Sequence, residues 1–205
     1  MQSVKIGILG LGTVGSGTVN VLTRNSREIS RRAGRDIEIY RVADRDLDKP
    51  KSCDTSNINL TDDAFEVIND PDIQIVVELI GGTGIAKDLV VKAIENGKHV
   101  VTANKALIAM HGNELFELAQ EKGVTIAFEA AVAGGIPIIK AMREGLAGNR
   151  IEWLAGIING TGNFILTEMR EKGRDFADVL AEAQALGYAE ADPTFDIEGI
   201  DAAHK

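Results

Sequence analysis

Residues 4–15 read VKIGILGLGTVG, and this stretch decides the fold. The run over residues 4–9 is apolar enough for a buried strand, and GLGTVG over residues 10–15 matches the pattern G-x-G-x-x-G directly after it. An amphipathic segment over residues 13–30 follows, with Thr13 as its expected N-cap. A strand, a glycine-rich turn and a helix in this order predict the first unit of a doubly wound α/β sheet that binds a dinucleotide.

Each glycine of this motif has its own predicted role. Gly10 allows a tight turn, Gly12 lets the backbone approach a pyrophosphate, and Gly15 lets the helix pack close to the strand. The start of the helix supplies free N–H groups and partial positive charge, so we assign Thr13 and Val14 to the same cofactor site.

Strands continue to alternate with helices after the motif. We expect strands at 37–43, 73–79, 99–102 and 125–129, and helices at 62–69, 85–96 and 106–122. This order implies a parallel sheet with right-handed crossovers, hence a Rossmann-type doubly wound domain over residues 1–136. The pattern then changes, and we expect a helix from Pro137 to about residue 144, a strand at 151–158, and helices at 161–172 and 175–186. Residues 137–205 are therefore interpreted as part of a second, mixed α/β domain.

The composition excludes several classes of protein. The chain has 205 residues, 44% of them hydrophobic, and a net charge of −9, which argues against nucleic acid or an anionic membrane as a partner. The single cysteine, Cys53, excludes a disulfide framework and a cysteine-based zinc site. We find neither a secretory signal nor a long apolar run, and we therefore expect a soluble, cytoplasmic protein.

The end of the second expected strand carries the candidate ribose-binding group. Asp44 lies there and favours the 2′-hydroxyl of NAD. Arg45 follows, with Lys49 and Lys51 nearby, and these cations suit the 2′-phosphate of NADP. The two signals conflict, so the sequence leaves the choice between NAD and NADP open.

The later strands end at the same edge of the sheet, where ligands bind in such folds. Gly81 and Gly82 leave room for a flat ring, and Thr83 offers a hydroxyl group. Lys105 stands beside an expected helix N-terminus, where a cation is electrostatically unfavourable, and we interpret that cost as a sign of function.

Two further segments contain groups that could bind an ion or transfer a proton. Residues 129–136 combine one carboxylate with free carbonyls in a small-residue loop, which suits either a monovalent cation or a close-packed hinge. Asp201 and Lys205 are spaced i, i+4, which makes them either a surface ion pair or an acid–base couple.

Six motifs together resemble homoserine dehydrogenase over the whole chain. They are KIGILGLGTVGSG, ELIGG, HVVTANKALIA, FEAAVAGGIPIIK, GIINGTGNFILT and AQALGYAEADPTFDIEGIDAAHK. The resemblance implies NAD(P)-dependent interconversion of L-homoserine and L-aspartate 4-semialdehyde, on the route to threonine, methionine and isoleucine. It also implies a homodimer. Members of the family continue well beyond Lys205, so we expect the 205 residues alone to be poorly active.

The resemblance also assigns roles to residues of this chain. Lys205 matches the proton donor, Lys105 the second active-site lysine, and Asp201 an acidic substrate contact. Glu190 matches the residue that binds the amino group of homoserine, and Gly187 a backbone contact beside cofactor and substrate. The sodium-binding loop of the family matches the carboxylate and carbonyl groups of Glu129, Val132, Gly134 and Ile136.

Other functions fit the sequence less well. An aldehyde-oxidising dehydrogenase needs a nucleophilic cysteine near the nicotinamide, whereas Cys53 follows the second strand on the adenine side. Another Rossmann oxidoreductase acting on a small amino-acid or hydroxy substrate, or a non-catalytic NAD(P)-binding module, stays open as an alternative.

Overall fold

The computed structural model describes residues 3–205, and the chain divides into two compact units. The first unit extends to Gly135 and the second comprises Ile136–Lys205. No helix in the described part of the chain is both long and apolar enough to cross a membrane.

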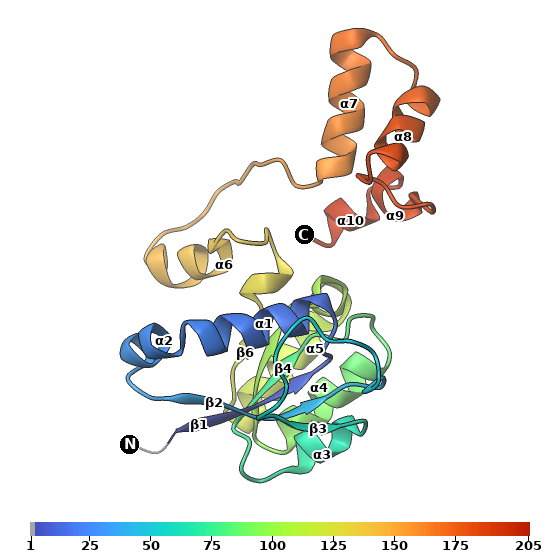
Figure 1. The fold of residues 1–205 in the computed structure, drawn as a ribbon. Coiled ribbons are helices and arrows are strands. Elements are labelled where there is room, and N and C mark those ends of the chain that lie inside the picture. The colour runs from blue at the N-terminus through green and yellow to red at the C-terminus, as the bar shows by residue number, and fades with distance from the viewer. Residues whose placement is uncertain (1–2) are drawn as a thin grey trace. The chain divides into compact units, whose positions relative to one another are not determined.

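The first unit is built on one parallel sheet (Figure 1). Its strands are β1 (Val4–Leu9), β2 (Ile37–Ala43), β3 (Asn59–Thr61), β4 (Ile75–Glu78), β5 (His99–Thr102) and β6 (Ile126–Ala127). Their spatial order is β3-β2-β1-β4-β5-β6, and all five neighbouring pairs are parallel. This is the strand order of the doubly wound Rossmann fold, so the predicted fold class is confirmed.

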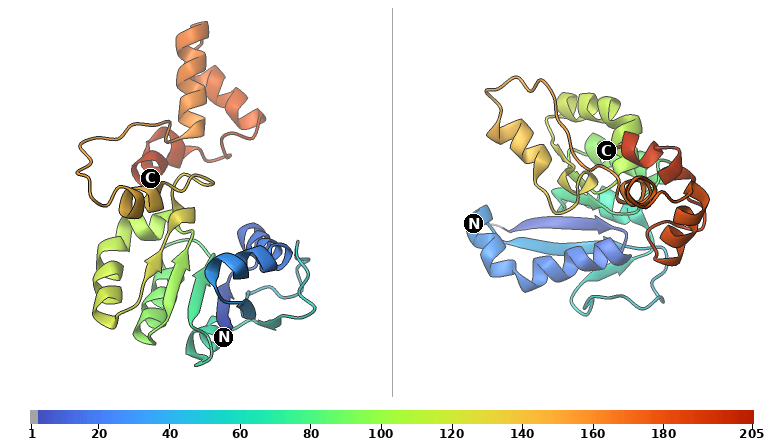
Figure 2. Two further views of the ribbon diagram at one scale, coloured as in Figure 1. Left: turned by 90° about the vertical axis from the view of Figure 1, so that its left-hand side faces the viewer. Right: turned by 90° about the horizontal axis from the view of Figure 1, so that it is seen from above.

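Helices cover both faces of this sheet (Figures 1 and 2). They are α1 (Thr13–Arg24), α2 (Ser26–Ala33), α3 (Ala64–Asn69), α4 (Ile85–Glu95) and α5 (Lys105–Lys122), with the 3₁₀ turn η1 (Glu129–Ala131) after β6. One buried cluster packs β1 residues such as Ile8 against Val19 of α1, and the other packs Val76 of β4 against Leu89 of α4 and Leu115 of α5. Strands that are buried on both faces explain the near-continuous apolar runs in the sequence.

The second unit is helical in the described residues. Its elements are α6 (Ile138–Lys140), the π-helical turn η2 (Ala141–Gly145), α7 (Gly160–Lys172), α8 (Phe176–Ala185), α9 (Thr194–Ile197) and α10 (Ile200–Ala203). A small core of Ile165, Val179, Ala183 and Ala189 joins α7 to α8. Asp175 is the N-cap residue of α8, without a side-chain cap hydrogen bond, and Gly173 ends α7 in the left-handed conformation.

The strand expected at 151–158 does not form. These residues have no regular secondary structure, and Trp153, Leu154 and Ile157 are exposed by 80%, 65% and 78%. A strand needs a neighbour to satisfy its backbone hydrogen bonds. Among the described residues of the second unit there is no second strand that could provide them.

Several predicted boundaries were also wrong. The helix expected at 13–30 breaks at Asn25, which leaves the helical region at φ −104°, ψ 15°, and α2 begins at the next residue. Gly12, not Thr13, is the N-cap residue of α1. The short edge strand β3 was missed, since three residues carry too little periodicity to be recognised. Residues 128–131 leave the sheet in η1, so β6 is shorter than expected.

The turn between β1 and α1 depends on one close approach. Gly10 has φ +96°, and its N–H donates to the Ala43 carbonyl at 2.8 Å. The Gly15 backbone lies so near this turn that a Cβ atom on Gly15 would stand 2.0 Å from the Gly10 carbonyl oxygen. The helix can therefore start directly after the strand only with glycine at this position.

We predict that Gly15→Ala lowers the free energy of unfolding of the first unit by about 3 kcal/mol, because backbone atoms have to move to admit the methyl group. Gly17→Ala in the same helix is the matched control, since its Cβ would meet no atom within 4 Å. That substitution should leave stability unchanged or raise it by roughly 0.5–1 kcal/mol. Urea unfolding of both variants measures the difference, and equal stability would contradict the packing argument.

Candidate functional site

The glycine-rich turn ends at the start of α1, and a helix N-terminus is a position that suits an anion. Gly12 has an extended conformation, and its carbonyl accepts the first helical hydrogen bond, from Ser16 N–H at 2.9 Å. A Cβ on Gly12 would have no atom of the chain within 4 Å, so the space beside it is open to a ligand. Thr13 and Val14 are the first two helical residues, as a phosphate-binding helix N-terminus requires.

Asp44 connects the end of β2 to this turn. Its Oδ2 accepts a hydrogen bond from the Leu11 N–H at 2.6 Å, and its Oδ1 accepts from the Asp46 N–H at 3.0 Å. The Lys51 ammonium group lies 3.1 Å from Oδ1. Burial alone would raise the pKa of Asp44, but the hydrogen bonds from Asp46, Leu11 and Lys51 lower it overall. Asp44 is therefore a charged group that orients the glycine-rich turn.

Two cavities adjoin Asp44. The first, of about 270 Å³, is lined by Leu11, Gly12, Thr13, Ser16, Asp44, Arg45, Asp46, Lys49, Pro50, Lys51 and Ser52. The second, of about 570 Å³, is lined by Gly10, Gly12, Ala43, Asp44, Arg45, Asp62, Ala64, Leu79, Ile80, Gly81, Gly82, Ile85 and Leu89. The glycines of the turn, Asp44 and Arg45 thus lie together beside these two cavities, which combine polar and apolar lining residues.

The loops after β4 and β5 carry the other candidates of the first unit. Gly81 and Gly82 both have positive φ, at +83° and +74°, so the chain turns sharply after β4. Lys105 is the first residue of α5, and Asn104 caps that helix by accepting the Leu107 N–H at 3.1 Å. Thr83 is half-buried beside the Gly82 turn. The fully buried Glu78 at the end of β4 was not singled out as a functional residue, although it begins the motif ELIGG, because the sequence does not show its burial.

A cavity of about 680 Å³ lies within the second unit. Its lining residues are Asn159, Gly160, Thr161, Asn163, Phe164, Thr167, Gly187, Tyr188, Asp196, Asp201 and Lys205. Asn159 Nδ2 donates to Asp196 Oδ1 at 2.8 Å and to Asp201 Oδ2 at 3.1 Å. The Lys205 ammonium donates to the Ile158 carbonyl at 2.6 Å and lies 3.8 Å from the Asp201 carboxylate.

Only some of the residues that the sequence assigns to the substrate site line this cavity. Gly187, Asp201 and Lys205 line it together, whereas Glu190 is exposed and is not among its lining residues. Glu190 contributes a backbone contact instead, since its carbonyl accepts from Gln184 Nε2 at 3.0 Å. Asp196 and its bond to Asn159 were not singled out, because only the folded chain brings residues 159 and 196 together.

Residues 129–136 form an irregular segment. Ala133 has φ +46° and Gly135 φ +83°, so the backbone turns repeatedly and presents carbonyl groups in different directions. The Ile136 carbonyl accepts the Ile138 N–H at 2.8 Å, which leaves it one further lone pair. Oxygen donors of this kind suit a hard cation. Clusters of three or more His, Cys, Asp or Glu side chains that would hold a metal ion do not occur within residues 3–205.

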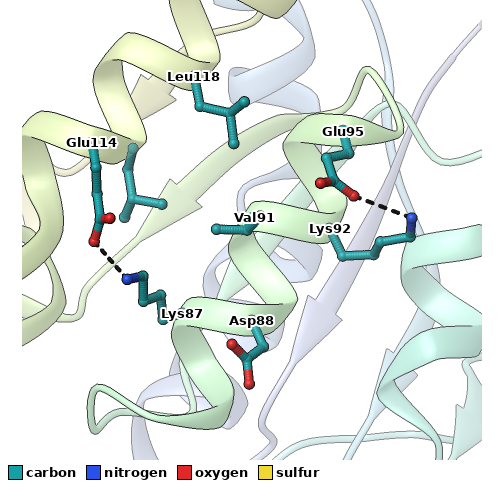
Figure 3. Close-up of a pocket in the computed structure, with 8 residues that line it drawn as sticks. Lys87, Asp88, Val91, Lys92, Glu95, Glu114 and Leu118 are labelled. Carbon is teal, nitrogen blue, oxygen red and sulfur yellow. Dashed lines mark hydrogen bonds and ion pairs between the residues drawn. The ribbon is translucent and has the colours of Figure 1, made fainter.

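A further cavity, of about 480 Å³, is a groove between α4 and α5 (Figure 3). Lys87 pairs with Glu114 across it at 2.7 Å, and Lys92 pairs with Glu95 along α4 at 3.2 Å. The groove contains none of the glycine-rich turn and none of the strand ends. Four of its charged side chains are held in these two ion pairs, and we do not count the groove as part of the site.

The strand order, the glycine-rich turn and the acid after β2 define the first unit as a Rossmann domain of the dinucleotide-binding class. Two family models match the chain, and both describe the same family within this class. Residues 10–129 match "Homoserine dehydrogenase, NAD binding domain", and residues 137–205 match "Homoserine dehydrogenase". The chain belongs to the homoserine dehydrogenase family.

Individual relatives are similar along the whole chain. The homoserine dehydrogenase of Pseudomonas aeruginosa is 72% identical over 205 residues, which is 100% of this chain and 47% of that protein. A crystal structure of a homoserine dehydrogenase from Thiobacillus denitrificans superposes with a TM-score of 0.92 at 67% identity, covering 100% of this chain and 47% of the other. A hyperthermophilic archaeal homoserine dehydrogenase in complex with NADPH has a TM-score of 0.81 at 30% identity, with 100% and 67% covered. The chain spans about half the length of the curated relatives it matches.

We predict that Asp44→Asn lowers the free energy of unfolding by about 1–2 kcal/mol near pH 7, because a neutral amide loses the charge-assisted bonds from Lys51 and the backbone. The pKa of Asp44 is depressed in the folded state, so the wild-type advantage exists above the ordinary value of 3.8. It is lost as the pH falls through the lower folded pKa. Urea unfolding of both proteins at about pH 7 and about pH 3 measures this, and an equal difference at both pH values would contradict the assignment.

Proposed function

We propose that this chain is the NAD(P)-binding part, with a portion of the substrate-binding part, of an enzyme that interconverts L-homoserine and L-aspartate 4-semialdehyde by hydride transfer. The observation that carries the proposal is the polar cavity of the second unit, where Lys205 and Asp201 converge in a chain of this family. The test is a spectroscopic assay of nicotinamide reduction by the full natural protein with L-homoserine and NAD or NADP. Nucleotide binding without turnover would favour a non-catalytic NAD(P)-binding module instead.

The cofactor would bind along the glycine-rich turn of the first unit. Gly10, Gly12, Gly15 and the first N–H groups of α1, on Thr13 and Val14, would hold the pyrophosphate. Bound there, the nicotinamide supplies or accepts the hydride.

The adenosine ribose would lie beside Asp44. The carboxylate suits the 2′-hydroxyl of NAD, whereas Arg45 and Lys49 line the same cavity and suit the 2′-phosphate of NADP. Gly81 and Thr83 in the loop after β4 would border the nicotinamide half. We propose that the cofactor is NADP or NAD.

Reduction of the aldehyde requires a proton for the carbonyl oxygen as well as a hydride for the carbon. The Lys205 ammonium would donate that proton and stabilise the developing alkoxide. Asp201, one turn earlier, and the Ile158 carbonyl support this role because they hold the ammonium in one orientation. In the oxidative direction the neutral amine of Lys205 takes the proton back.

Further groups would bind the rest of the substrate. We assign the α-ammonium group of homoserine to Glu190 and a backbone contact to Gly187. Glu190 is exposed, so this role requires its side chain to turn toward the cavity. Lys105 would be a second cation near the nicotinamide and the substrate.

A structural sodium ion is also part of the proposal. The Glu129 carboxylate and the carbonyls of Val132, Gly134 and Ile136 would bind it, and the turns at Ala133 and Gly135 support a site built from the backbone. The full protein is proposed to be a homodimer, for which the exposed apolar side chains of residues 151–158 offer surface.

We predict that Lys205→Ala in the full natural protein lowers kcat by about 10²–10⁴-fold, because the proton donor is removed. The affinity for NAD(P)H should stay within about twofold, since the cofactor binds to the other unit. Stopped-flow kinetics and fluorescence titration of NAD(P)H measure the two quantities. Retained turnover would refute the role of Lys205.

We predict that sodium chloride raises the Tm of the full natural protein by about 2–4 °C relative to choline chloride of equal ionic strength, because an ion that binds only the folded state stabilises it. Glu129→Gln should abolish this difference. Glu121→Gln, an exposed substitution on α5, is the control and should preserve it. A sodium effect that survives in Glu129→Gln would exclude the assigned site.

A further inference from the structure

The end of β4 carries a charge that the mechanism above does not use. Glu78 is the last residue of that strand and is 0% exposed. None of the ion pairs in the described part of the chain includes it. Burying a carboxylate without a counter-ion lowers the stability of the folded state. An aliphatic side chain at this position would avoid that loss of free energy.

Hydrogen bonds from two loops compensate this buried charge. Glu78 Oε1 accepts the N–H groups of Ile80 at 2.8 Å and Gly81 at 3.1 Å. Its Oε2 accepts the Thr102 hydroxyl at 2.6 Å, from the end of β5. Because a displaced loop would leave the carboxylate unsatisfied, these bonds fix both loops more firmly than neutral groups would.

The network continues to the start of α5. Thr102 Oγ1 accepts the Asn104 N–H at 2.9 Å, and Asn104 Nδ2 donates to the Gly82 carbonyl at 2.6 Å. Asn104 Oδ1 in turn caps α5 through the Leu107 N–H. Glu78, Thr102 and Asn104, which we name the Glu78 cluster, thus close a ring of hydrogen bonds between the Gly81–Gly82 turn and the helix that begins with Lys105.

The position of the ring in the sheet indicates which part of the cofactor it serves. In the order β3-β2-β1-β4-β5-β6, β1 and β2 carry the glycine-rich turn and Asp44, while β4 and β5 belong to the second mononucleotide half. We propose that the Glu78 cluster is a positioning element for the nicotinamide half of the cofactor. It holds the Gly81–Gly82 turn and Lys105 in the one arrangement that aligns the ring for hydride transfer, an inference that rests on the proposed function.

Glu78→Gln tests this proposal, since the amide keeps the size of the side chain and removes its charge. In the full natural protein we expect kcat to fall by about ten- to a hundredfold through misalignment of the ring. A primary deuterium isotope effect on kcat should rise, because hydride transfer becomes rate-limiting. The affinity for ADP-ribose, which lacks the nicotinamide, should stay within about twofold, while NAD(P)H binds more weakly.

Lys98→Met is the matched control for a merely structural role. Lys98 is 4% exposed, and its ammonium donates to the carbonyls of Asp70 and Ile73 at the opposite edge of the sheet. This variant should lower the Tm without changing kcat or the isotope effect. If Glu78→Gln behaves like Lys98→Met, or if it weakens ADP-ribose and NAD(P)H equally, the proposal is overturned.

Thr102 provides a second test should Glu78→Gln fail to fold. Thr102→Val removes the hydroxyl and should reproduce the loss of kcat, whereas Thr102→Ser restores the bond and should rescue it. Unchanged kcat in Thr102→Val overturns the proposal. If the wild-type protein shows no turnover, the proposed function fails. The binding measurements then still test the Glu78 cluster: Thr102→Val should weaken NAD(P)H but not ADP-ribose, and an equal effect on both overturns the proposal.

Discussion

The close approach of Gly15 to the Gly10 carbonyl is the constraint on which the rest of the first unit depends. It allows α1 to begin directly after β1, so that the helix N-terminus stands over the carboxyl end of the sheet. Asp44 then secures the same turn from β2 through the Leu11 N–H. Without this approach α1 could not begin directly after β1, and no helix N-terminus would lie at the position that suits an anion.

The carboxyl edge of the sheet uses two buried or half-buried acids in related ways. Asp44 accepts backbone N–H groups from the turn after β1, and Glu78 accepts them from the turn after β4. Each carboxylate therefore fixes the backbone of one turn at the carboxyl end of the sheet. The two carboxylates differ in their side-chain partners. Asp44 also pairs with the Lys51 ammonium group, whereas Glu78 accepts the Thr102 hydroxyl. Under the proposed function, these buried polar groups would set the geometry of the ligand-binding turns as well as contribute to stability.

The second unit shows which features a sequence pattern can predict and which it cannot. Its helices α7 and α8 follow from amphipathic spacing and glycine stops, and they were predicted closely. The strand at 151–158 was predicted from an equally clear apolar run and was wrong, because apolarity does not supply the hydrogen-bonding neighbour that a strand requires. The cavity shows the same limit, since Asn159 meets Asp196 and Asp201 only through the packing of α7, α9 and α10.

The sequence by itself determined the parallel α/β class, the glycine-rich turn, the acid after β2 and the family, because periodicity, spacing and motif are local properties that survive in one dimension. Only the tertiary structure decided that Glu78 and Thr102 meet across β4 and β5, and that Glu190 stays exposed while Lys205 reaches the Ile158 carbonyl. These contacts join residues far apart in the chain. They follow from strand register and helix packing, which no local pattern of residues records.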